Sequence, residues 1–173
     1  MKTRSVVVVA ALLCSFMLPN AAHCQTFASR FTIRFPYKVT AVAFSRDNQL
    51  IACGSGQAVH IIGAGNRKVL RKFKLKALPM AMAFSRQGTI LFVVYEKKSD
   101  ELALDYVDVL NGKVLATIPL KSMDLYDVDS IEVSPDGSLL ALGNPDDGGQ
   151  TIVVRVRDHK ILKTLTGASP LFS

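Results

Sequence analysis

The sequence predicts an all-β fold assembled from about three repeated four-stranded antiparallel sheets. One pattern recurs three times: an apolar alternating run, a Phe-Ser or Val-Ser pair, a polar turn and a second apolar run. The three copies are VTAVAFSRDNQLIACG (39–54), PMAMAFSRQGTILFVV (79–94) and VDSIEVSPDGSLLALG (128–143). Basic-apolar segments also recur, at 67–75, 112–120 and 159–167. No stretch after residue 24 has sustained helical periodicity, so strands are the expected elements throughout.

The spacing of the repeats predicts how these sheets are organised. Phe44, Phe84 and Val133 mark the same place in the three copies, at spacings of 40 and 49 residues. A period of this length is typical of propeller blades. We therefore predict an incomplete β-propeller-like array with blades at about 39–75, 76–120 and 121–167. Propellers close with about four to eight blades, so we also expect self-association through the open blade edges.

Within each predicted blade, the first two strands are joined by a tight hairpin. The turn residues Asp47-Asn48, Gln87-Gly88 and Asp136-Gly137 tolerate the positive φ angles that such turns require. Three further short apolar runs are β-branched or aromatic and are predicted to be strands: 59–62, 91–94 and 151–154. The fourth strand should begin with the basic-apolar segment, after a turn that contains Asn111-Gly112 in the second blade.

The first 24 residues have the features of a signal peptide. Lys2 and Arg4 precede an apolar run of thirteen residues, 6–18. A membrane-spanning helix needs about 20 apolar residues, so the run fits a secretory signal better. Cleavage after Cys24, cleavage after Ala22 and a lipid anchor on Cys24 are the three options. We expect an exported protein, periplasmic or secreted, with no transmembrane anchor after cleavage and an N-terminal strand segment at 25–38.

The chain is moderately basic. Removing Lys2 and Arg4, the only charged residues of the signal segment, lowers the net charge from +7 to +5. The charges are scattered except in the segment 67–76, which we interpret as a solvated outer strand whose lysines discourage aggregation. An anionic partner for this segment is the alternative. Export and the lack of an aromatic-basic array argue against a nucleic-acid partner.

The segments VSPDGSLLALG (133–143) and AFSRDNQLIACG (43–54) resemble the WD-repeat β-propeller family, or its divergent YVTN-type relatives. The resemblance covers residues 39–167 and implies a propeller that acts as a scaffold, a receptor or, in some members, an enzyme. The sequence has no tryptophan, so the family's Trp-Asp pair is missing. Ile61-Ile62, Val107-Asp108 and Arg157-Asp158 are expected at its position.

Few residues have the pattern of a catalytic or metal site. We interpret Cys53 as a small buried residue in an apolar strand, His60 as a strand residue and His159 as part of a charged turn. One weak metal candidate is a group of loop aspartates that could hold calcium: Asp124, Asp127, Asp129, Asp146 and Asp147. Plain exposed turns explain the same residues. No catalytic residue and no cofactor are predicted.

These observations predict an exported, non-enzymatic protein-binding or scaffold module with a protein partner. The main alternative is a propeller-class enzyme or subunit, lactonase-like or quinoprotein-like. A third reading is a truncated remnant of a longer propeller.

Overall fold

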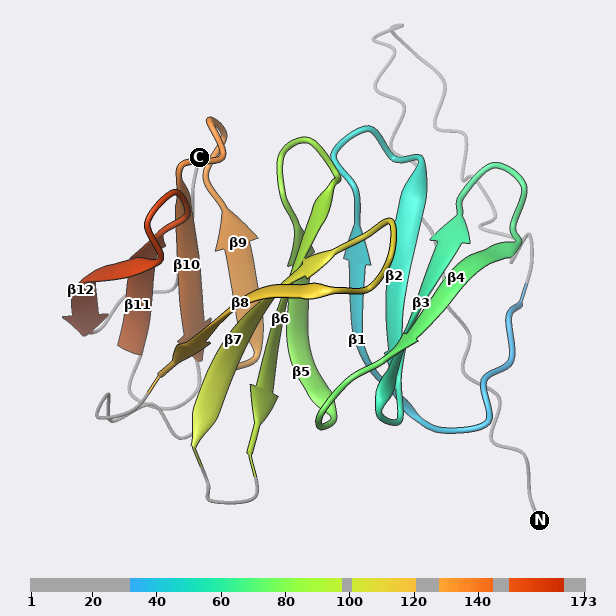
Figure 1. Ribbon diagram of the computed structural model, residues 1–173, viewed down its shortest axis with the longest axis horizontal. Helices are drawn as coiled ribbons and strands as arrows, with labels where there is room; N and C mark the ends of the chain where they lie inside the picture. Colours follow the sequence, from blue (N-terminus) through green and yellow to red (C-terminus); the bar gives the residue numbers. More distant parts are fainter. Residues whose placement is uncertain (1–31, 98–100, 121–127, 145–149, 167–173) are drawn as a thin grey trace, which may run out of the picture. The chain divides into compact units, whose positions relative to one another are not determined.

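A computed structural model describes residues 32–97, 101–120, 128–144 and 150–166, and it is all-β (Figure 1). The first sheet contains β1 (Val39–Phe44), β2 (Leu50–Ser55), β3 (Ala58–Gly63) and β4 (Val69–Lys74). The second contains β5 (Pro79–Phe84), β6 (Ile90–Glu96), β7 (Leu102–Asp108) and β8 (Val114–Pro119). The third contains β9 (Ser130–Val133), β10 (Leu139–Asn144), β11 (Gln150–Arg155) and β12 (Lys160–Thr166). None of the described residues forms a helix that could cross a membrane.

Each sheet is an antiparallel meander whose strands pair in chain order, such as β1-β2-β3-β4. The predicted fold class is therefore confirmed: the described residues form three four-stranded sheets in an incomplete propeller-like arrangement. By compactness the chain divides into residues 1–38 and 39–173, and the second unit contains all of these strands. Within it, β5 contacts both β1 and β9, so the first strands of the sheets are neighbours.

The turn chemistry expected from the sequence is confirmed. Asn48, Gly88 and Gly137 have φ angles of 57°, 72° and 78° in the hairpin turns between the first two strands of each sheet. Between the third and fourth strands, Gly112 has a φ of 72°. The sequence did not predict that Arg67 and His159, at the equivalent places, adopt φ values of 59° and 60°.

A buried serine fixes each hairpin turn. Ser45, Ser85 and Ser134 are the serines of the repeated Phe-Ser or Val-Ser pair, and all three are buried. Their Oγ atoms accept the backbone N–H five residues later, at 2.9, 3.1 and 2.9 Å. The serine at this position is therefore required by the hairpin, which explains its recurrence.

Two apolar cores lie between the sheets, because alternate residues of a strand point to opposite faces. We call the face turned toward the preceding sheet the leading face and the other the trailing face. One core joins the trailing face of the first sheet to the leading face of the second; it contains Ala41, Ala43, Ala52, Val59, Ile61, Met82, Phe84, Leu91, Val93 and Val107. The other joins the second and third sheets; it contains Phe92, Val94, Leu104, Tyr106, Leu140, Leu142, Ile152 and Val154.

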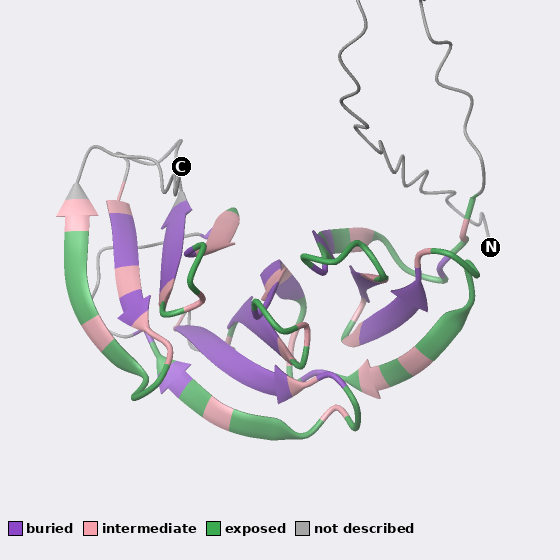
Figure 2. Cartoon of the chain, turned by 90° about the horizontal axis from the view of Figure 1, so that it is seen from above, coloured by how far each residue is buried: buried purple, intermediate pink, exposed green. Residues whose placement is uncertain are grey.

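The fourth strands lie at the outer edges of the sheets. Figure 2 shows buried strands on the inner side and strands of mixed exposure along the outer side. In β4, Lys72 and Lys74 are exposed, and Arg71 and Phe73 are half-buried. The basic-apolar segment of the first repeat is therefore an outer strand, as the sequence predicted.

The predicted N-terminal strand segment, 25–38, is described only in part. Residues 32–38 contain no strand, and Pro36 lacks the N–H that a strand ladder needs; residues 25–31 lie outside the described part, so the segment stays a prediction. The expected Trp-Asp correspondence was misplaced. Bulges align Val107 with Ile62 and Val154, so Val107-Asp108 corresponds to Ile62-Gly63 and Val154-Arg155.

Candidate functional site

The residues considered from the sequence as catalytic candidates differ in burial. Cys53 is buried in β2, and burial raises the pKa of its thiol to about 11, so the thiol is neutral at pH 7. His60 is buried in β3, where burial and then the charge of Lys72 lower the pKa of its imidazole. His159 lies in an exposed turn, as expected. Neither Cys53 nor His60 is exposed enough to meet a substrate.

The aspartate group lies mostly outside the described residues, which exclude Asp124, Asp127, Asp146 and Asp147. Asp129 is exposed just before β9, and its backbone N–H donates to the carbonyl of Gly143 at 3.2 Å. Among the residues that the structure describes, no three His, Cys, Asp or Glu side chains are placed to hold a metal ion. The calcium site stays a prediction.

A buried carboxylate lies on the second sheet. Asp105 is 1% exposed and accepts hydrogen bonds from the hydroxyls of Tyr95, at 3.2 Å, and Thr117, at 2.5 Å. Burial and then the neighbouring Asp105 raise the pKa of Tyr95 to about 12. These groups satisfy one another in the interior, so we regard them as a structural network.

A polar surface lies at one end of the three sheets. We call this end the hairpin-turn end. It consists of the turns within 45–49, 85–89 and 134–138 and the turns that follow the third strands, within 63–68, 108–113 and 155–160. The two kinds of turn are joined by backbone hydrogen bonds, such as that from Val156 N–H to the Ser138 carbonyl at 2.9 Å. The three hairpin turns lie at the upper end in Figure 1.

The carboxylates of this end are engaged in the turns themselves. Asp47 and Asp136 each accept a serine hydroxyl at 2.6 Å and a backbone N–H at 3.0 Å. The hydrogen bond from Ser134, followed by those from Ser138, lowers the pKa of Asp136 to about 2; similar bonds lower the pKa of Asp47. Asp108 accepts two backbone N–H groups of its turn, at 2.7 and 3.1 Å. These aspartates stiffen the turns.

Two arginines of the first and second hairpins reach the third. Arg46 Nη1 donates to the carbonyl of Pro135 at 2.8 Å, across 89 residues of sequence. The Arg86 side chain lies against Gly137. A Cβ added to that glycine would be only 3.1 Å from the Cβ of Arg86. The third turn therefore contacts an arginine from each of the other two hairpins, through the guanidinium of Arg46 and the aliphatic part of Arg86.

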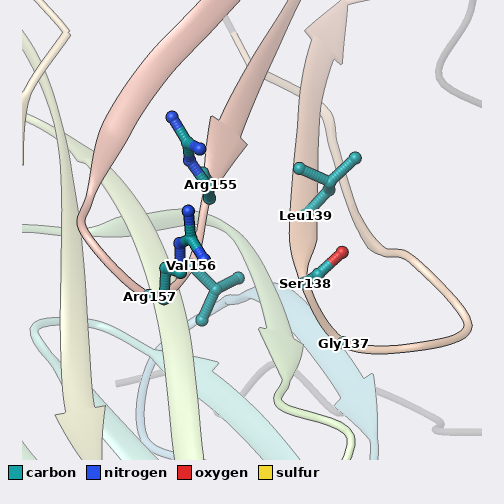
Figure 3. Close-up of a pocket in the computed structure, with 6 residues that line it drawn as sticks. All are labelled: Gly137, Ser138, Leu139, Arg155, Val156 and Arg157. Carbon is teal, nitrogen blue, oxygen red and sulfur yellow. The ribbon is translucent and has the colours of Figure 1, made fainter.

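Two more arginines border a shallow hollow in the third sheet, with a volume of about 220 Å³. Gly137, Ser138 and Leu139 line one side. Arg155, Val156 and Arg157 line the other side, where the side chains of both arginines are visible in Figure 3. Arg155 Nε pairs with Asp158 Oδ1 at 3.1 Å.

The arrangement favours an anionic ligand. Of the described carboxylates, none lies within ion-pair distance of Arg46, Arg86 or Arg157. A planar guanidinium donates two parallel hydrogen bonds to a carboxylate or phosphate. The third hairpin and its hollow therefore lie beside arginines that can bind acidic groups.

Sequence reasoning missed this site. It singled out the basic segment 67–76, whose lysines lie along the outer strand. The available signal was Arg46 and Arg86 at the same place in two repeats, where Pro135 stands in the third. Nothing in the repeat pattern indicates that both arginines extend to the third turn, because that contact joins different sheets.

The fold and this surface define an all-β protein of repeated propeller-like sheets with an arginine-rich end. No protein-family model matches the chain, and no curated protein matches it. By contrast, 891 chains of solved structures match, which marks the architecture as a common one. One is hydrazine synthase of Kuenenia stuttgartiensis, with a TM-score of 0.63 and 17% sequence identity. The match covers 83% of this chain but only 40% of that chain, and it shows the fold alone.

Proposed function

We propose that the protein is an exported, non-enzymatic binding or scaffold module that presents its hairpin-turn end to an acidic segment of a partner protein. The observation that carries this proposal is the gathering of Arg46, Arg86, Arg155 and Arg157 around the third hairpin. Serine and aspartate hydrogen bonds stiffen the first and third hairpins, and the bond from Arg46 to the Pro135 carbonyl joins these two turns. A preorganised surface loses less conformational entropy on binding.

The proposal treats the repeats as divergent relatives of the WD-repeat or YVTN type, whose members bind partners through the loops at the ends of the sheets. It is supported by the lack of a catalytic constellation among the described residues, where Cys53 and His60 are buried. A purified chain with hydrolase or oxidase turnover that a single substitution abolishes would favour the enzyme alternative.

The binding proposal is tested with a fluorescein-labelled octaglutamate peptide and anisotropy titration. We expect binding that weakens as salt is added, because the charges are exposed and screened. The double variant Arg86→Gln, Arg157→Gln should weaken binding about 2- to 30-fold, at roughly 0.2–1 kcal/mol for each exposed charge.

The matched control removes two charges from the outer strand: Lys72→Gln, Lys74→Gln. It lowers the net charge equally but leaves the hairpin-turn end intact. Equal weakening in both double variants would mean that the peptide responds only to net charge, and the proposed site would be rejected.

Export is tested separately, by N-terminal sequencing of the protein recovered outside the cytoplasm. A mature N-terminus after Ala22 or after Cys24 is expected. Recovery of the intact N-terminus would contradict export by a cleaved signal.

A further inference from the structure

The positive charge of the repeats is concentrated in the first one. The segment that contains the first sheet, 39–76, has seven Lys or Arg residues and one acidic residue, Asp47, which gives a net charge of +6. The segments that contain the second and third sheets, 77–120 and 121–166, have net charges of −1 and −3. The sequence between Asp47 and Glu96 contains no acidic residue. The first sheet therefore differs in charge from two sheets that share its fold.

Most of this charge lies on the outer strand β4 and immediately beside it. Lys68, Lys72, Lys74 and Lys76 are all exposed. Phe73 packs against the core between the first two sheets, so Lys72 and Lys74 on either side of it lie on the opposite face of the strand. Within the described residues, no carboxylate forms an ion pair with any of these four lysines. They are therefore available to an anion outside the chain.

A β-bulge in β4 exposes apolar side chains among these lysines. The pairing of β3 with β4 shifts between Ile61 and Ile62, and Leu70 is the extra residue of β4. A bulge redirects the side chain of the strand that contains it. Leu70 is 43% exposed, and the neighbouring Val69 is 48% exposed. The start of β4 therefore presents two apolar side chains beside the lysines.

The other outer strands have the same bulge with less charge around it. Leu115 and Leu162 are the extra residues of β8 and β12, and they are 52% and 46% exposed. No charged residue belongs to β8, and Lys160 and Lys163 are the charged residues of β12. Leu115 is exposed although the first sheet lies against the second. Exposure at this position thus results from its place on the outer strand, whether or not another sheet lies alongside.

We propose that the outer edge of the first sheet, β4 with Lys68 and Lys76 beside it, binds the surface of a membrane that contains anionic phospholipids. Basic residues close to such a surface are attracted to the negatively charged headgroups. Long lysine side chains reach these headgroups while their aliphatic parts cover apolar surface. Val69 and Leu70 enter the boundary between headgroups and acyl chains, where their apolar area leaves water. A lipid surface therefore satisfies the lysines and the apolar residues together.

Co-sedimentation with vesicles tests the binding. Vesicles of equal parts phosphatidylcholine and phosphatidylglycerol should bind the full chain more tightly than vesicles of phosphatidylcholine alone, and added salt should weaken the difference. Lys72→Gln, Lys74→Gln should weaken binding to the mixed vesicles about 10- to 30-fold. Every variant has the same N-terminus, so the apolar run 6–18 contributes equally to all of them. Equal binding of wild type to the two kinds of vesicle would overturn the proposal.

The matched control is Arg86→Gln, Arg157→Gln, which removes the same charge from the hairpin-turn end. It should weaken vesicle binding much less than the lysine variant does. Equal weakening would mean that the vesicles respond to net charge alone, and the assignment to β4 would be rejected.

A single tryptophan tests which strand meets the lipid. The sequence has no tryptophan, so Leu70→Trp and Leu115→Trp each give the chain one indole fluorophore. On the mixed vesicles, the emission of the Leu70 variant should shift to shorter wavelength and be quenched by brominated acyl chains. The Leu115 variant should keep the emission of an indole in water. Circular dichroism checks that both variants retain the fold.

Unchanged emission of the Leu70 variant, or equal shifts in the two variants, would overturn the lipid assignment. If the lysines still mattered in that case, the edge would bind a soluble polyanion instead. The acidic-peptide proposal fails or holds separately, because it depends on the arginines of the hairpin-turn end. The lysine variant should weaken vesicle binding and spare peptide binding, and the arginine variant should do the reverse.

Discussion

The serine of each hairpin shows how one residue type can serve two structural needs. Ser45 and Ser134 accept a backbone N–H from the start of the next strand and donate to the aspartate two residues later. Ser85 accepts the same kind of N–H, but Gln87 stands where the other turns have an aspartate. The first and third hairpins therefore have an ionised acceptor that the second lacks.

This difference predicts a pH-dependent contribution from Asp136. Its folded pKa is about 2, below the ordinary 3.8, so its ionised form stabilises the fold above about pH 4 and this contribution is lost as the pH falls toward 2. The melting temperature of the wild type should exceed that of Asp136→Asn by a constant amount above pH 4, and the gap should shrink toward pH 2. Circular dichroism melts measure it. A gap that is independent of pH would show that the carboxylate bonds contribute no net stability.

The turns between the third and fourth strands determine how each outer strand joins its sheet. In all three sheets one residue of this turn has a positive φ: Arg67, Gly112 or His159. A left-handed conformation costs a residue other than glycine about 1–2 kcal/mol. Only the second sheet uses glycine here, and that glycine also lies against the first sheet.

Gly112→Ala should therefore destabilise the protein by at least about 1–2 kcal/mol. Besides the unfavourable φ of 72°, the added Cβ would be 2.6 Å from Phe73 Cβ. Gly65→Ala is the matched control, because Gly65 lies in the equivalent turn of the first sheet with nothing within 4 Å of its Cβ position. Urea unfolding should give little change, or a small gain, for the control. Equal losses in the two variants would contradict the assigned strain.

At the scale of the whole molecule, the contacts between sheets decide stability. Tyr106 lies in the core between the second and third sheets, where its ring packs edge-to-face with Phe92 and its centroid is 4.5 Å from that of the His159 ring. Burial, with the nearby charge of Asp158, raises the pKa of Tyr106 to about 12. No hydrogen-bond partner for its hydroxyl is found in the described part of the chain.

Removing that hydroxyl should not lower the free energy of unfolding. Tyr106→Phe should leave the unfolding free energy unchanged or raise it by up to about 1–3 kcal/mol, because an unsatisfied buried polar group is lost. Tyr106→Ala, which removes the ring as well, should cost about 3–5 kcal/mol. Chemical unfolding of the two variants separates the ring from the hydroxyl. A loss above about 1 kcal/mol in the phenylalanine variant would indicate a hydrogen bond to the hydroxyl.

The candidate site belongs to this larger scale, and this is why the sequence did not reveal it. Arg46 and Pro135 are 89 residues apart and meet only because the three hairpins share one end of the molecule. The predicted aspartate group came from two loops of the third repeat, and most of it lies outside the described residues. A charge run such as 67–76 is visible in a sequence, whereas four separated arginines around one turn are not.

The sequence by itself determined the strands, their order and their turns, because these depend on alternation, β-branched runs and local residues with positive φ such as Asn48, Gly88 and Gly137. It also determined the repeat and hence the division into three sheets. Only the tertiary structure decided which faces pack, that Phe44 is exposed where Phe84 is buried, and that Arg46 and Arg86 surround the third hairpin. Those properties depend on contacts between sheets. Such contacts join residues that are far apart in the sequence, so a local sequence pattern does not predict them.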